Sequence, residues 1–183
     1  MIGAGAKSLR RAVAAASLFV LAACSGEPPS AAQCPVGGIL PDANTIVQFR
    51  DGGGRDITDM VVQAQIVDIR IGCVYATRRN KAAVTLDLQI AFAAERGPAD
   101  RARRAALPYF VAIVDGERNV VARENFVAGF EWTDNRPRVG RVDQWEPYIP
   151  LKSNFDGPSY QIMVGFQLTA DQLAWNRSQR PQR

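Results

Sequence analysis

The chain has 183 residues, of which 47% are hydrophobic, and it carries a formal net charge of +4. It contains no histidine, which excludes Ser-His-Asp and Cys-His catalysis, histidine-ligated zinc and histidine proton shuttles. Three basic residues precede position 24, and the remaining chain has 19 basic and 18 acidic residues, a net charge of +1. This near balance gives no indication of nucleic-acid binding.

The N-terminal segment has the pattern of an export signal rather than of a folded element. A basic stretch precedes the apolar residues 12–23, which are too few to cross a bilayer core of ~30 Å as a helix of ~20 residues. The stretch ends in Leu21-Ala22-Ala23-Cys24, which resembles the bacterial lipobox. The basic residues are Lys7, Arg10 and Arg11.

This resemblance implies that residues 1–23 are a lipoprotein signal peptide, cleaved before Cys24. It also implies acyl chains such as palmitate on the thiol and amino group of Cys24. The alternative is an ordinary signal peptide that ends in small residues, with an incidental cysteine. Ser25 follows Cys24 where an aspartate could stand, and by resemblance to diderm lipoproteins this favours the outer membrane, facing the periplasm.

Residues 24–33 are expected to form the lipidated cysteine and a flexible tether. The stretch after Cys24 is rich in proline and small residues and has no apolar period. Fully extended it reaches about 30 Å. The tether can therefore clear the lipid headgroups and stay at one membrane surface.

The two other cysteines, Cys34 and Cys73, predict a disulfide, because exported proteins fold in an oxidising compartment. The loop that they close has about 40 residues and corresponds to roughly 4 kcal/mol of stabilisation on the chain-entropy model. The alternative is two buried thiols. A metal site is not expected, since two cysteines without histidine make a poor ligand set.

Between residues 34 and 176 the apolar residues recur with a period of two, which indicates strands. The phase slips between Ile66 and Val67, which predicts a β-bulge there and places Val67 on one face with Ile69, Ile71 and Cys73. Turn sequences separate the strands. We expect an all-β domain, an immunoglobulin- or fibronectin-III-like β-sandwich of about seven strands, with a small β-barrel as the alternative. The expected strands cover residues 44–50, 61–75, 84–92, 107–114, 120–131, 139–149 and 160–168.

Helix is expected to be minor. Residues 99–106 are rich in alanine and arginine and predict one or two helical turns. Thr169 and Gln172 have the spacing of a capping box, which predicts a short helix over 170–176. The basic tail, 177–183, is expected to be disordered.

No pattern predicts catalysis or a cofactor. The glycines at 52–54 lack the lysine and serine or threonine of a phosphate loop. Acidic pairs flank two tryptophans, as in some glycosidases, but they fall at strand ends or in loops, where solvated carboxylates are ordinary. Lys152 and Ser153 are adjacent, and on a strand they would point to opposite faces. We therefore expect a protein that is not an enzyme and holds no metal.

A possible ligand or partner surface lies in the polar, proline-rich second half of the chain. Exposed tryptophans there could stack on glycan rings, and the neighbouring arginines could contact phosphate groups. The alternative is that the aromatic residues cover an open end of the core and the arginines form a solvated face. The candidate residues are Trp132, Arg136, Arg138, Arg141, Trp145 and Tyr148.

As a whole, the segment after the signal resembles hypothetical lipoproteins of the bacterial envelope, a likeness that implies no activity and no functional residues. The expected function is an accessory or interaction module of an envelope protein assembly, with peptidoglycan or glycan binding as the alternative. The expected partners are the membrane, through Cys24, and a periplasmic or outer-membrane protein. The resemblance is carried by the lipobox, Cys34-Pro35, Gly52-Gly53-Gly54-Arg55-Asp56, Leu107-Pro108-Tyr109-Phe110-Val111, Leu168-Thr169-Ala170-Asp171-Gln172-Leu173 and Asn176-Arg177.

Overall fold

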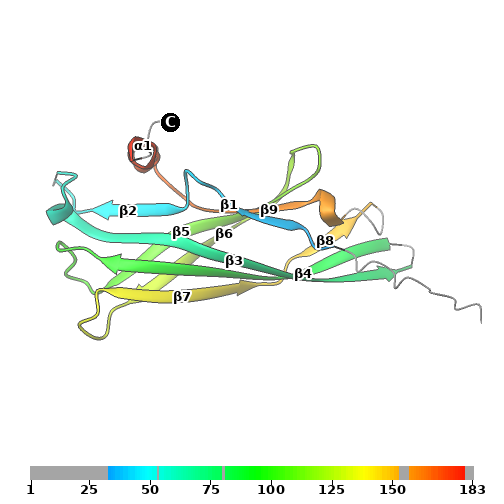
Figure 1. Ribbon diagram of the computed structural model, residues 1–183, viewed down its shortest axis with the longest axis horizontal. Coiled ribbons are helices and arrows are strands. Elements are labelled where there is room, and N and C mark those ends of the chain that lie inside the picture. Colours follow the sequence, from blue (N-terminus) through cyan, green and yellow to red (C-terminus); the bar gives the residue numbers. More distant parts are fainter. Residues whose placement is uncertain (1–32, 53, 80, 153–156, 180–183) are drawn as a thin grey trace, which may run out of the picture. The chain divides into compact units, whose positions relative to one another are not determined.

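The computed structural model describes residues 33–52, 54–79, 81–152 and 157–179 (Figure 1). Cys24, the proposed signal peptide and most of the proposed tether lie outside these residues. The described chain is all-β with a single short C-terminal helix, as predicted. Its strands are β1 (Val36–Ile39), β2 (Thr45–Phe49), β3 (Met60–Arg78), β4 (Lys81–Arg96), β5 (Arg104–Val114), β6 (Val120–Glu131), β7 (Arg138–Trp145), β8 (Tyr148–Leu151) and β9 (Gln161–Phe166).

The strands form two sheets that face each other across one core. The four-stranded sheet has the order β1-β9-β5-β6, with β1 parallel to β9 and the other pairs antiparallel. The five-stranded sheet has the order β2-β3-β4-β7, and β8 pairs with β4 beyond the end of β7. The predicted sandwich is confirmed, and β5 has the central position that its apolar residues indicated.

The period-two pattern identifies the residues of the core. On β4 the alternate residues from Val84 to Phe92 are almost fully buried, and on β9 the same is true of Ile162, Val164 and Phe166. These side chains pack between the sheets with those of β5, including Leu107. Burial of a Leu or Phe side chain contributes about 1.5–3 kcal/mol. The buried residues of the described chain form one cluster, so this part of the chain has its own hydrophobic centre.

The sandwich has more strands than the expected seven. The additional strand β1 pairs in parallel with β9, so the two ends of the domain lie side by side. Its short Val-Gly-Gly-Ile sequence has no alternation that would predict a strand. The strand expected over 139–149 divides into β7 and β8. Between them the carbonyl of Pro147 accepts a hydrogen bond of 3.0 Å from the N–H of Leu86.

The predicted bulge in β3 is present. Ile66 pairs with Phe92 and Asp68 with Ala91, which leaves Val67 as the extra residue. Val67 is 51% exposed, so its expected place on the face of Ile69 is wrong. The bulge shifts the phase one residue later than the sequence pattern suggested.

The helix expected over 99–106 is not formed. The Oδ1 atom of Asp100 accepts the backbone N–H groups of Ala102 and Arg103, at 2.9 and 3.2 Å. Arg103 adopts a left-handed backbone conformation, with φ 54°, and β5 begins at Arg104. Side-chain hydrogen bonds to the backbone compete with helix formation, and here they make a turn.

The helix α1 (Ala170–Ser178) begins with the predicted capping box. The Thr169 hydroxyl oxygen accepts the N–H of Gln172, and the Gln172 side chain accepts the N–H of Thr169. The helix ends two residues later than expected, and residues 180–183 of the expected tail lie outside the described chain. The Trp175 ring packs edge-on against Phe49 at 5.6 Å, which holds α1 beside β2. No helix in the described ranges has the length and apolarity to cross a membrane.

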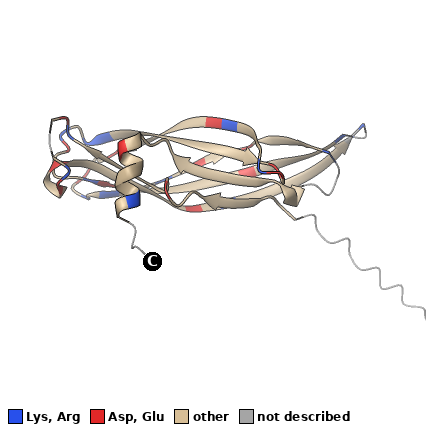
Figure 2. Cartoon of the chain, turned by 90° about the horizontal axis from the view of Figure 1, so that it is seen from above, with Lys and Arg blue, Asp and Glu red and all other residues tan. Residues whose placement is uncertain are grey.

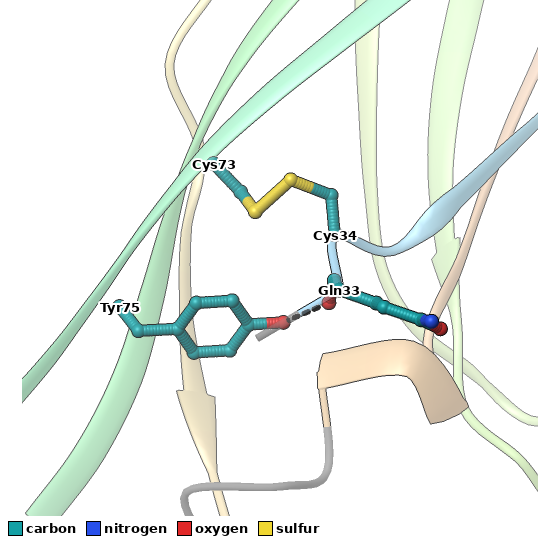
Figure 3. The surroundings of a disulfide bond; sticks show 4 residues. All are labelled: Gln33, Cys34, Cys73 and Tyr75. Carbon is teal, nitrogen blue, oxygen red and sulfur yellow. Dashed lines mark hydrogen bonds between the residues drawn. A yellow bond between two sulfur atoms is a disulfide. The ribbon is translucent and has the colours of Figure 1, made fainter. Parts of the chain in front are cut away.

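The disulfide between Cys34 and Cys73 is confirmed, with a Cα–Cα distance of 5.6 Å (Figure 3). Cys34 precedes β1 of one sheet and Cys73 lies on β3 of the other, so the bond joins the two layers. Beside it, the Tyr75 hydroxyl donates a hydrogen bond of 2.5 Å to the carbonyl of Gln33. Both contacts fasten the start of the described chain to β3.

Candidate functional site

The aromatic and arginine residues proposed as one surface do not form one surface, although Arg141 and Trp145 lie on the same face of β7. Trp132 is 2% exposed, and its indole N–H donates a hydrogen bond of 2.9 Å to the carbonyl of Pro137. Its ring lies 6.4 Å from that of Phe130 in the core. The proposal of Trp132 as an exposed stacking platform is therefore wrong, and its covering of the core is correct.

The three arginines lie in different places. Arg136 pairs with Asp134 in the loop before β7, with 2.6 Å between Nε and Oδ2. Arg138 pairs with Glu95 at 2.8 Å on the outer face of the five-stranded sheet. Arg141 lies opposite the buried Phe92 and so belongs to the inner face. Two of the three arginines therefore share β7 but point to opposite faces.

The last two candidate residues, Trp145 and Tyr148, lie on opposite faces of the five-stranded sheet. Trp145 pairs with Leu88 on the inner face, where its ring packs edge-on against Phe126 at 5.4 Å. Tyr148 pairs with Thr85 on the outer face and is 66% exposed. A glycan surface that combines these residues with Trp132 has no geometric basis.

The inner face of β7 carries a polar cluster where β6 and β7 approach. The Tyr109 hydroxyl donates a hydrogen bond of 3.0 Å to Oδ2 of Asp143, and the Nε of Arg141 donates to Oδ1 of the same carboxylate. Burial, and secondarily the negative charge of Asp143, raises the pKa of Tyr109 well above its ordinary value. The hydroxyl is thus held in its protonated, donating form, and Asp143 is committed to structural hydrogen bonds.

Sheet edges are the other places where such a fold can bind a partner, because an edge strand has unpaired N–H and C=O groups. The edge of β2 is covered by α1. The side-chain amide of Gln172 donates to the carbonyl of Val47 at 3.1 Å, and that of Asn176 donates to the carbonyl of Thr45 at 2.7 Å. These bonds occupy the acceptors that an added strand would need.

Three other edges are short or interrupted. β1 has four residues and begins two residues after the disulfide. β8 also has four residues, one of which is Pro150, and proline cannot donate to an added strand. On β7 the charged pair Arg141–Asp143 points inward. Short strands, proline and inward charges are the devices that keep an edge from pairing.

β6 is the longest edge strand of the described chain, with 12 residues. The carbonyl of Gly129 accepts a hydrogen bond of 3.3 Å from Arg141 of β7, so it points away from β5. Backbone groups of alternate residues point the same way along an antiparallel edge. Those of Val127, Asn125 and Arg123 therefore point outward as well. The pairing of Val127 with Pro108, which has no N–H, agrees with this assignment.

The outward stretch from Arg123 to Val127 is accessible. All of residues 120–125 are exposed, and Val127 is 60% exposed. Within the described part of the chain, no hydrogen bond reaches the outward backbone groups of Arg123, Asn125 or Val127. We call residues 123–127 the open edge. It can accept an extended segment as an additional strand.

The side chains of the open edge add specificity to these backbone groups. The Arg123 guanidinium lies 4.2 Å from the ring centroid of Phe110 on the outer face. Glu124 pairs with Val111 on the inner-face side and is exposed. Opposite charges across paired strands contribute about 0.2–1 kcal/mol each. A strand with a basic residue beside Glu124 would fit this edge best.

Sequence reasoning identified β6 as a strand but not as an edge. Strand order depends on pairing between distant segments, and nothing local to residues 120–131 reports it. The one available signal is Pro108, which excludes a ladder hydrogen bond at its N atom.

Comparison of the chain with protein-family models, with curated proteins and with solved structures finds no match. Among the described residues, no cluster of three or more His, Cys, Asp or Glu could hold a metal ion.

Proposed function

We propose that this protein is a non-enzymatic lipoprotein of the bacterial envelope that serves as an interaction module in a protein assembly. A lipid on Cys24 holds it on the outer membrane, facing the periplasm, and an extended segment of a partner protein adds to β6. The lipobox-like sequence supports the anchor. The observation that carries the binding role is the open edge, whose backbone groups are exposed while the β2 edge is covered by α1.

The open edge offers enough hydrogen bonding for a specific complex. Each of its three outward residues presents one N–H and one C=O, about six hydrogen bonds in all with an antiparallel strand. A net contribution of about 0.5–1.5 kcal/mol per bond amounts to about 3–9 kcal/mol before the cost of association. Side-chain pairs at Arg123 and Glu124 select among partners.

Val127→Pro tests the binding role without removing a bond of the native sheet. The Val127 N–H points outward, and proline is tolerated on edge strands where the N–H faces solvent. The substitution removes a donor that the partner needs and places a ring at the edge. Val127→Thr keeps the N–H and is the matched control.

The assay is site-specific photo-crosslinking in intact cells. A photo-reactive residue at position 123 should capture one partner, and a probe at position 68, on the outer face of the other sheet, should not. Capture should persist in Val127→Thr and be lost in Val127→Pro, with both variants melting near the wild-type temperature. Undiminished capture in a folded Val127→Pro would refute binding through this edge.

A further inference from the structure

The β3–β4 hairpin ends in a basic tip that lies at the same end of the domain as the N-terminal attachment. Arg78 ends β3 and pairs with Lys81 at the start of β4, and Arg79 stands in the turn between them. Arg79 and Lys81 are exposed, and neither makes an ion pair with any described residue. Figure 2 shows the blue of basic residues at this tip.

The start of the described chain is fixed a short distance behind the tip. Gln33 is bonded to Tyr75 and Cys34 to Cys73, both on β3 (Figure 3). Tyr75 pairs with Val84, three residue pairs behind the pairing of Arg78 with Lys81. At about 3.3 Å per residue, the hairpin projects about 10 Å past the point where the chain joins the domain. This projection is close to the Debye length of about 8 Å at physiological salt, the distance over which exposed charges interact before salt screens them.

Two more basic residues flank this end. Lys152 and Arg118 are exposed, and Lys152 interacts electrostatically with Asp115 of the β5–β6 turn. Asp115 also accepts the backbone N–H groups of Glu117 and Asn119, at 3.0 and 2.8 Å. Asp115 is therefore engaged within its own turn, and Glu117 of the same turn is exposed. Among the described residues named at this end, the basic side chains of Arg79, Lys81, Arg118 and Lys152 outnumber these two acids.

The opposite end of the sandwich carries charges of both signs that pair with each other. Arg96 lies 2.7 Å from Asp100, and Arg138 lies 2.8 Å from Glu95. Arg136 is paired with Asp134. Arg101 and Arg104 at that end are exposed and make no ion pair with a described residue. The basic tip is therefore distinguished by its place beside the point where the N-terminal segment joins the domain.

We infer that the basic tip contacts anionic lipid headgroups of the membrane to which the chain is anchored. The inference rests on the proposed lipid at Cys24. From Cys24 to Gln33 the chain extends at most about 30 Å, and it joins the domain beside the tip. A domain held this way meets the surface with its hairpin first. The contact orients the sandwich and limits its rotation about the tether.

The test uses residues 25–183 without lipid, which retain both sheets, the core of the described residues and the disulfide. Binding is measured by co-sedimentation with vesicles of phosphatidylcholine alone or with phosphatidylglycerol. Each basic residue near an anionic surface contributes about fivefold to partitioning. Arg79→Gln with Lys81→Gln should therefore lower binding to the anionic vesicles about 25-fold. High salt should remove the preference for anionic lipid.

The matched control is Arg101→Gln with Arg104→Gln. It removes the same charge from exposed positions at the opposite end, and it should leave vesicle binding unchanged. Equal binding of the wild type to both vesicle types, no binding to either, or equal losses in the two double variants would each overturn the inference. Since residues 25–183 lack Cys24, these outcomes do not depend on lipidation. The mass of the N-terminal peptide from the exported protein tests the anchor separately.

Discussion

Removal of the Cys34–Cys73 disulfide should destabilise the domain by an amount that follows from the size of the loop. The cysteines are 39 residues apart. In the chain-entropy model this separation gives about 13 cal/mol/K, or about 4 kcal/mol at 25 °C. For a domain of this size 1 kcal/mol corresponds to about 2–4 °C. Cys34→Ala with Cys73→Ala should therefore lower the melting temperature by about 8–16 °C.

The assay is thermal and urea unfolding of residues 25–183, followed by circular dichroism. Wild-type protein under reducing conditions should unfold at the same urea concentration as the double variant, because both lack only the cross-link. Tyr75→Phe, which removes the neighbouring bond to Gln33 and keeps the disulfide, should cost about 1 kcal/mol. A loss below about 1 kcal/mol in the double variant would refute the loop-entropy reasoning.

Three more predictions concern the core, the polar cluster and the covered edge. Trp132→Ala should cost about 3–5 kcal/mol in urea unfolding, because the side chain is buried at the end of the core. The folded-state pKa of Tyr109 is raised above its unfolded value near 10. The contribution of the protonated Tyr109 hydroxyl to the free energy of unfolding is therefore full below pH 10 and is lost as pH rises through the folded pKa. Tyr109→Phe removes this titration. The melting temperature of the variant should therefore fall less steeply at alkaline pH than that of the wild type. Gln172→Ala with Asn176→Ala should expose the β2 edge, cost about 1 kcal/mol per lost bond and raise the dimer fraction in sedimentation.

Features that depend on local pattern could be predicted from the sequence. The alternation from Val84 to Phe92 identifies a half-buried strand because side chains of a strand point alternately to two faces. The capping box at Thr169 is likewise complete within four residues. The disulfide could be predicted from the number of cysteines, because the assignment of Cys24 to lipid leaves only Cys34 and Cys73 to pair.

Features that depend on distant contacts could not be predicted. Trp132 is buried because the loop after it turns back and Pro137 accepts its indole N–H. The sequence offered this burial only as one of two alternatives. The turn at Asp100 replaces a helix because the carbonyl of Arg103 also accepts the N–H of Trp132, at 2.9 Å, and so aligns β5 with β6. The candidate surface failed for a local reason, because side chains alternate along β7 and so Arg138 and Arg141 lie on opposite faces.

The parallel pairing of β1 with β9 has a consequence for the order of events in folding. β1 pairs only with β9 within its sheet, and Val36 aligns with Gln161 near the other end of the domain. A chain that emerges from its N-terminus therefore presents β1 long before its sheet partner exists. Cys34 and Cys73 appear much earlier, so oxidation can attach the first strand to β3 while β9 is still absent. The cross-link then shortens the search that closes the sandwich, because loop closure is entropically costly for distant segments.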